Sequence, residues 1–149
     1  MPDIPARLQE LLADFSFVTS RSERAELLIE LADRFEPVPP QIAVPPYPEE
    51  HRVKYCESEA YVWAKDQPDG TLKFHFAVEN PQGLSAMAMA VILDETLSGA
   101  PLEQVARVTP DIVLRIFGND ISMGKGQGLM GMVSAVQAEA KRRLNNGQT

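Results

Sequence analysis

Cys56 is the residue whose chemistry stands out, because it is the single cysteine of the chain. A thiolate is a strong nucleophile, but a lone cysteine has no second thiol in its own chain with which to close a disulfide. Attack by Cys56 on a sulfur atom would therefore give a persulfide or an adduct with another molecule. The alternative is that Cys56 is a small, inert part of the core, since free cysteines are among the most buried residues.

The neighbours of Cys56 favour the reactive interpretation. Glu57, Ser58 and Glu59 follow it, between two stretches with the periodicity of strands. We therefore expect Cys56 at or near a loop tip, where a thiol can meet a large partner. Lys54 favours the thiolate and the two glutamates oppose it, so the sequence leaves the thiolate fraction open.

Metal chemistry is poorly supported by the sequence. His51, Cys56 and His75 are the only soft ligands, and their spacing matches no zinc finger or hydrolase motif. Neither histidine lies in a recognisable nucleophile motif or triad, and one thiol cannot hold an iron–sulfur cluster. We therefore expect no metal and no cofactor in this chain.

Residues 126–131 read Gly-Gln-Gly-Leu-Met-Gly and match the dinucleotide fingerprint G-x-G-x-x-G. That fingerprint binds a nucleotide only between a strand and a helix, with an acidic residue about 20 positions later. Only 18 residues follow Gly131. Glycines that enter a tightly packed helix are the favoured interpretation, and a small nucleotide-binding protein stays open as an alternative. Gly124 and Lys125 form no phosphate loop, because glycine follows the lysine in place of serine or threonine.

The elements that must position these residues begin with two helices. Leucines at helical spacing behind a proline predict a helix over residues 5–15. Ser20 and Glu23 form a capping box for a second helix, which Pro37 ends. Residues 37–48 hold six of the twelve prolines, and we expect a stiff, extended strap there that lies over the core.

The periodicity changes to two residues after Arg52, which predicts strands. Residues 68–70, Pro-Asp-Gly, are a strong hairpin signal. Residues 71–79 then alternate in the manner of an antiparallel strand with one buried face. We expect a meander of about three strands, with residues 56–59 joining the first strand to the second.

The second half of the chain reads as helical. Asn80 and Pro81 are expected to cap a helix over residues 84–97, which is apolar nearly all round and so packs on several sides. Further helical segments are predicted over residues 101–105, 109–118 and 127–144. The order predicts a single α+β domain over residues 1–149, with a small antiparallel sheet of about three strands packed against several helices.

Composition excludes several classes of partner. The 149 residues are 44% hydrophobic and suffice for one core. A net charge of −7 lacks the cations that a phosphate backbone demands, so no nucleic acid partner is expected. No apolar run approaches 18 residues and the first residues do not resemble a signal peptide, so we expect no membrane partner and a cytoplasmic location.

The charge is distributed unevenly along the chain. Residues 1–79 hold 8 basic and 15 acidic side chains, whereas residues 80–149 hold 6 of each. The acidic half is either a solvated face or a docking surface for a basic partner. A docking face made by the apolar strap residues is the counter-hypothesis; these residues are Ile42, Val44 and Tyr47.

Two segments carry a family resemblance. Residues 53–61 read Val-Lys-Tyr-Cys-Glu-Ser-Glu-Ala-Tyr, and residues 124–132 read Gly-Lys-Gly-Gln-Gly-Leu-Met-Gly-Met. They resemble the motifs V-x-G-C-x-S-x-V-W and S-R-x-x-G-L-x-x-M of the SufE family of sulfur acceptor proteins, which work beside cysteine desulfurases in iron–sulfur cluster assembly. Tyr55 departs from the family glycine, and Gly124 and Lys125 replace serine and arginine.

The resemblance runs from about residue 8 to residue 140. It implies an α+β protein that takes persulfide sulfur from a cysteine desulfurase, stimulates that enzyme and passes the sulfur to a scaffold protein. Pyridoxal phosphate would stay on the desulfurase, so the chain would be a sulfur-transfer partner rather than a stand-alone enzyme. On this hypothesis Cys56 is the nucleophile and persulfide carrier, Ser58 a donor to the thiolate, and Lys125 a nearby cation. The alternative is a non-catalytic activator that binds the desulfurase and leaves Cys56 as packing.

Overall fold

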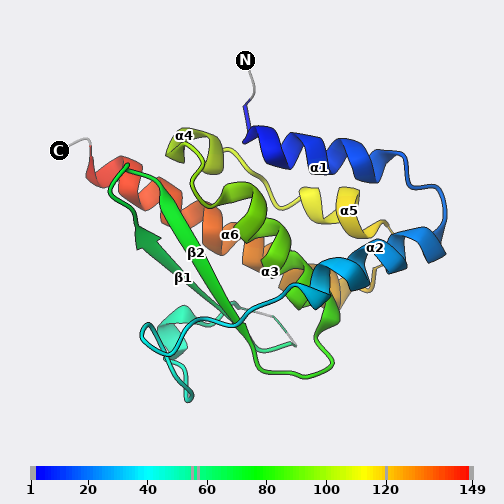
Figure 1. The fold of residues 1–149 in the computed structure, drawn as a ribbon, viewed down its shortest axis with the longest axis horizontal. Coiled ribbons are helices and arrows are strands. Elements are labelled where there is room, and N and C mark those ends of the chain that lie inside the picture. Colours follow the sequence, from blue (N-terminus) through cyan, green and yellow to red (C-terminus); the bar gives the residue numbers. More distant parts are fainter. Residues whose placement is uncertain (1–2, 55, 57, 120, 148–149) are drawn as a thin grey trace.

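The computed structural model describes residues 3–54, 56, 58–119 and 121–147. Its elements follow in chain order: α1 (Ala6–Ser16), α2 (Arg21–Asp33), the short 3-10 helix η1 (Glu49–His51), β1 (Ala60–Asp66), β2 (Leu72–Val78), α3 (Leu84–Leu97), α4 (Leu102–Val105), α5 (Ile112–Phe117) and α6 (Met123–Asn146). Helices pack on a small antiparallel sheet, so the predicted α+β class is confirmed (Figure 1).

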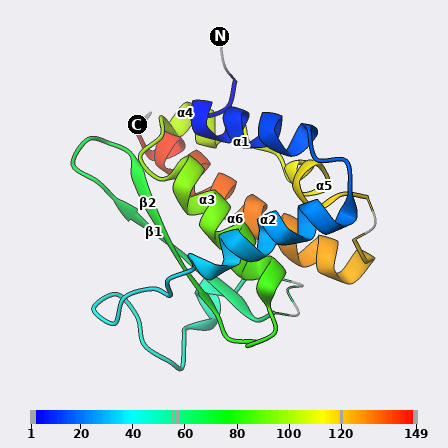
Figure 2. The ribbon, with the colours of Figure 1, turned by 45° about the vertical axis from the view of Figure 1, so that its right-hand side comes forward.

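Helix α3 is the centre of the structure. It contacts α1, α2, α6 and β2, and Figure 2 shows α2 crossing over it with α6 behind. Nine of its 14 residues are buried, which confirms the prediction from its nearly all-apolar sequence. The expected bounds of residues 84–97 are confirmed, but the expected cap at Asn80 and Pro81 is wrong, because Gly83 is the residue before the first turn. The Asn80 side chain instead accepts a hydrogen bond from the Gln82 N–H at 2.9 Å, which makes a turn before the helix begins at Leu84.

The hairpin of β1 and β2 follows the predicted turn. Asp69 accepts hydrogen bonds from the backbone and the hydroxyl of Thr71, and Gly70 takes a positive φ of 85°. In the described part of the chain the sheet has two strands, one fewer than the three expected. The expected first strand contributes one bridge, Arg52 to Tyr61, and the chain then approaches α6 at Val53 and Lys54.

The proline-rich segment 37–48 crosses the hairpin as a strap, but it is not extended throughout, because the Ile42 and Ala43 N–H groups donate to the Pro39 carbonyl and make a turn. The Val38 N–H donates to the Phe76 carbonyl at 2.8 Å, and Tyr47 lies 5.3 Å from the Trp63 ring. In Figure 1 this segment runs in pale blue and cyan from the end of α2 past β2 to η1. The strap buries Trp63 and its neighbours, so the sheet has a second apolar face besides the one on the helices.

The last helix begins earlier than its sequence pattern predicts. The expected start is residue 127, but α6 begins at Met123, where the Ser122 hydroxyl accepts a hydrogen bond from the Lys125 N–H at 3.3 Å. Glycines at the start of α6 lower its helix propensity, which favours the later start at residue 127. The hydroxyl of Ser122 is the local signal for the earlier start, and the expectation from the periodicity did not include it.

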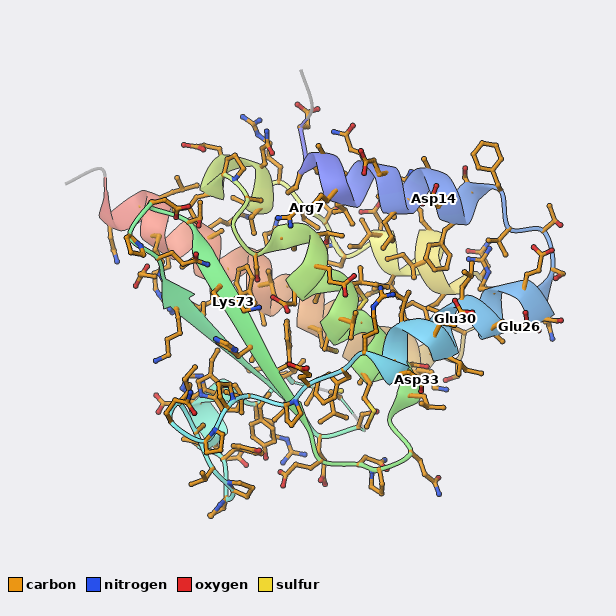
Figure 3. All side chains as sticks on the ribbon, viewed as in Figure 1. Arg7, Asp14, Glu26, Glu30, Asp33 and Lys73 are labelled. Carbon is orange, nitrogen blue, oxygen red and sulfur yellow. The ribbon has the colours of Figure 1, made fainter. Side chains whose placement is uncertain are left out.

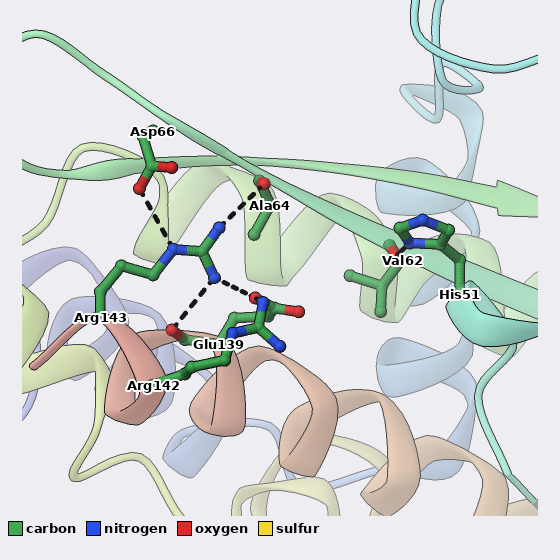
Figure 4. Close-up of polar contacts among 7 residues, drawn as sticks. All are labelled: His51, Val62, Ala64, Asp66, Glu139, Arg142 and Arg143. Atoms are coloured by element: carbon green, nitrogen blue, oxygen red, sulfur yellow. Dashed lines mark hydrogen bonds and ion pairs between the residues drawn. The ribbon is translucent and has the colours of Figure 1, made fainter. Parts of the chain in front are cut away.

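The far end of α6 is tied to β1, as Figure 4 shows. Arg143 donates to the Asp66 carboxylate at 3.1 Å and to the Ala64 carbonyl at 3.3 Å, and it also pairs with Glu139. These contacts fix the direction of α6 relative to the hairpin, and with it the position of the first turn. Among the described residues, no helix has the length and apolar character needed to cross a membrane.

Candidate functional site

The structure places Cys56 inside the protein. Its side chain is 7% exposed and belongs to the main hydrophobic core, so the expectation of an exposed loop tip is wrong. The Val53 N–H donates to the Ala60 carbonyl at 2.9 Å, and the Glu59 N–H donates to the Cys56 carbonyl at 3.1 Å. Although charged residues flank Cys56 in the sequence, its cavity is lined by Ala86 of α3 and Leu129 of α6. Tyr55 and Glu57 lie outside the described residues.

Cys56 lines a small cavity of about 40 Å³. The residues around it come from the segment before β1, from the start of α3 and from the first turns of α6: Cys56, Ser58, Ser85, Ala86, Gly124, Lys125, Gly128 and Leu129. The three site residues expected from the sequence, Cys56, Ser58 and Lys125, are therefore brought together. Ser85 was not expected; its signal was a hydroxyl near the start of an otherwise apolar run.

The cavity adjoins a groove at the surface. The groove has a volume of about 310 Å³ and shares Ser58, Ser85 and Lys125 with the cavity of Cys56. Its apolar sides include Ile29 of α2 and Leu84 of α3, which are 48% and 49% exposed. Large apolar side chains that are half exposed to water are typical of surfaces that bind another protein. These two lie beside the cavity of the buried thiol.

The charges around the groove have both signs. Glu26, Glu30 and Asp33 lie along the exposed side of α2, as Figure 3 shows, and give this helix an acidic surface. Lys125 places a cation where the groove meets the cavity of Cys56. Arg24 of the same helix instead serves the fold, since it donates to the Ile116 carbonyl at 2.5 Å.

The two histidines lie away from this cavity. His51 stacks on Trp63, with 5.0 Å between the ring centres, and its Nδ1 is 2.9 Å from the Val62 carbonyl. His75 pairs with Trp63 across the hairpin, where burial lowers the pKa of its imidazole and the charge of Lys73 lowers it further. Within the described residues, no three His, Cys, Asp or Glu side chains lie close enough to hold a metal ion.

The glycine fingerprint at residues 126–131 lies in the interior of α6. A dinucleotide site needs these glycines in the turn between a strand and a helix, and the element before α6 is the helix α5. Gly126 and Gly128 are buried there. The expected tight packing is found at Gly131, where a Cβ atom would lie 3.0 Å from the Lys54 carbonyl oxygen, whereas Gly126 leaves room for one.

Fold and site together define a small α+β protein that shelters a single thiol beside a lysine and a surface groove. The chain belongs to the SufE family: the family model, described as an Fe-S metabolism associated domain, matches residues 9–140. This confirms the family expected from the motifs around Cys56 and Lys125.

Individual relatives agree with the family assignment. The chain is 30% identical over 105 residues to a protein of Plasmodium vivax named "Cysteine desulfuration protein SufE", covering 70% of this chain and 43% of that protein. It is 26% identical over 139 residues to "SufE-like protein 1, chloroplastic/mitochondrial" of Arabidopsis thaliana, covering 93% of this chain and 36% of that one. The chain thus spans less than half the length of these curated relatives.

A solved structure shares the fold. The solution structure of a hypothetical protein from Thermus thermophilus superposes with a TM-score of 0.71 at 25% identity, covering 95% of this chain and 98% of that one. The arrangement of helices around the hairpin is therefore found in another protein of nearly the same extent.

Proposed function

We propose that this protein accepts sulfur from a cysteine desulfurase on Cys56 and hands it to an iron–sulfur cluster assembly scaffold. The observation that carries the proposal is the cavity that joins Cys56 to Ser58 and Lys125 in a chain of the SufE family. The names of the two curated relatives support the same chemistry. The proposal includes the cytoplasmic location expected from the sequence.

The transfer is an exchange between sulfur atoms. The Cys56 thiolate attacks the outer sulfur of a persulfide on the desulfurase, so that a new bond forms from Cys56 Sγ to that sulfur. The bond between the two sulfurs of the donor breaks, and its electron pair leaves with the desulfurase thiolate. Cys56 then carries the persulfide, and no external oxidant or reductant is consumed. The same exchange, with a scaffold thiolate as the attacking group, passes the sulfur on.

The cavity supports the storage of one extra sulfur atom. Its volume of about 40 Å³ exceeds the roughly 10–15 Å³ of cavity space that one water molecule needs. A persulfide on Cys56 adds one sulfur atom, for which this space suffices. Lys125 is the cation that would face the anionic sulfur, and Ser58 and Ser85 supply hydroxyl donors at the same wall.

The non-catalytic activator is the second candidate. The observation that favours it is the burial of Cys56, because a thiol that is 7% exposed within the hydrophobic core also fits simple packing. On this hypothesis the groove binds the desulfurase and no sulfur reaches Cys56. The two candidates therefore differ in whether Cys56 gains mass.

The test is intact-mass analysis after incubation with a cysteine desulfurase and cysteine. We expect the wild-type chain to gain the mass of one sulfur atom, and the gain to disappear on treatment with a thiol reductant. Cys56→Ala should gain nothing. An unmodified wild-type chain together with undiminished stimulation of the desulfurase by Cys56→Ala would instead establish the activator.

A further inference from the structure

Two glycines pack against the chain on either side of Cys56. A Cβ atom at Gly131 of α6 would lie 3.0 Å from the Lys54 carbonyl oxygen and 3.0 Å from Val53 Cγ1. Such a distance is shorter than ordinary van der Waals contact between heavy atoms. Helix α6 therefore touches the backbone just before Cys56 at a point where only glycine fits without displacement.

Gly83 makes the corresponding contact on the other side. A Cβ atom there would lie 2.9 Å from Val78 Cγ1 and 3.0 Å from both Cβ and Oγ of Ser58. Ser58 is held in place by the hairpin as well, because its carbonyl accepts a hydrogen bond from the Asn80 N–H at 3.2 Å. The segment that carries Cys56 is thus enclosed between α6 and the turn before α3.

The glycine at position 131 opposes the stability of its own helix. It lies in the interior of α6, where glycine costs about 1 kcal/mol relative to alanine. Helix formation therefore does not explain a glycine at position 131. The close approach of the Lys54 carbonyl does explain it, because a Cβ atom there would be too close to the carbonyl oxygen. Gly126 offers the contrast, because a Cβ atom there would meet only Ile121 Cγ2 at an ordinary 3.7 Å.

We propose that Gly131 and Gly83 are positioning residues that hold Lys54 against α6 and Ser58 against the turn before α3, so that the thiol of Cys56 stays in its cavity. The backbone hydrogen bonds from Val53 to Ala60 and from Glu59 to Cys56 make this segment a closed turn. A methyl group at either glycine pushes on the turn and moves Cys56 with it. Any effect of these glycines on sulfur transfer rests on the proposed function. Their effect on the position of Cys56 does not rest on it.

The experiment measures alkylation of the thiol by iodoacetamide under native conditions. Cys56 is the only cysteine, so every modified molecule reports on this site. We expect Gly131→Ala and Gly83→Ala each to raise the alkylation rate by about threefold or more, as local opening of the segment becomes easier. Gly126→Ala is the matched control, because it gives the same helix the same gain in helix propensity. We expect its alkylation rate to equal that of the wild type.

Denaturant unfolding of the same variants separates positioning from general loss of stability. If the glycines were merely structural, the alkylation rate would follow the global unfolding constant; the proposal requires an increase beyond it. Equal rates in Gly131→Ala and Gly126→Ala, or increases that the unfolding constants fully explain, would overturn the proposal. Failure of the wild-type chain to accept sulfur would overturn the proposed function and leave the alkylation result to decide the positioning role.

Discussion

Cys56 and Lys125 line the same small cavity, although one precedes β1 and the other lies in the first turn of α6. Cys56 is buried, whereas Lys125 is exposed and also borders the surface groove. A cation at this boundary can stabilise negative charge on sulfur as the charge moves between partners, with little rearrangement of the site.

Replacing Lys125 tests this role. Lys125→Met removes the charge but keeps most of the apolar stem, and we expect a first-turnover rate of sulfur acceptance roughly tenfold lower. Lys125→Arg keeps the charge and should retain most of the rate. The matched control is Lys141→Met, an exposed lysine near the other end of α6, with an unchanged rate. Equal rates in the wild type and Lys125→Met would show that the lysine takes no part in the transfer.

Substitution of Cys56 should also affect stability, because the side chain lies in the core. A thiol at a loop tip could be replaced without cost, but removal of a packed side chain leaves space that the structure fills only in part. We expect Cys56→Ala to lower the free energy of unfolding by about 1 kcal/mol, measured by urea denaturation. An unchanged urea midpoint in Cys56→Ala would contradict the packed position of the thiol.

The pH dependence of stability should carry a contribution from His75. Burial lowers the pKa of its imidazole most, the charges of Lys73 and Lys65 lower it further, and Asp94 opposes them. As the pH falls through about 6.5, the unfolded chain binds a proton that the folded chain does not yet bind, so the stability decreases with the pH.

His75→Gln removes this contribution and keeps a polar side chain on the strand. The free energy of unfolding of the variant should therefore decrease less between about pH 7.5 and pH 5.5 than that of the wild type. Both proteins should behave alike from about pH 9 to pH 8, where the imidazole is neutral in both states. Parallel curves through the acid range would mean that the burial of His75 does not affect its titration.

The sequence predicts the parts of this structure that depend on local signals. The Asp69 and Gly70 turn, the cap at Ser20 and the apolar helix over residues 84–97 each follow from neighbouring residues. The inward direction of Cys56 could not be predicted this way, because it depends on contacts with α6, which is distant in the sequence.

The motifs brought Cys56, Ser58 and Lys125 into one hypothesis before the structure showed them around one cavity. The two motifs lie far apart in the chain, so the resemblance to the family relates residues that no local sequence pattern connects. Ser85 was missed because a single serine at the start of an apolar helix carries no local sign of a site. The groove beside it arises from the packing of α2 and α3 and has no linear signature.

The acidic surface of α2 predicts how the protein would meet the proposed partner, a cysteine desulfurase. Glu26 and Glu30 lie on the exposed side of the helix that lines the groove, as Figure 3 shows. Basic residues on the partner would raise the rate of encounter, so the association rate of the wild type should fall with added salt. A double change, Glu26→Lys with Glu30→Lys, should lower that rate roughly tenfold at low salt and remove most of its salt dependence.

The matched control carries the same change of charge on another helix. Glu10→Lys with Asp14→Lys alters two exposed acids of α1, and should reduce the association rate far less if docking is local to α2. Stopped-flow association over a salt series gives the comparison, since screening slows encounter more than it changes dissociation. A wild-type rate that stays flat or rises with salt would contradict electrostatic docking, and would assign the contact to the apolar sides of the groove at Ile29 and Leu84.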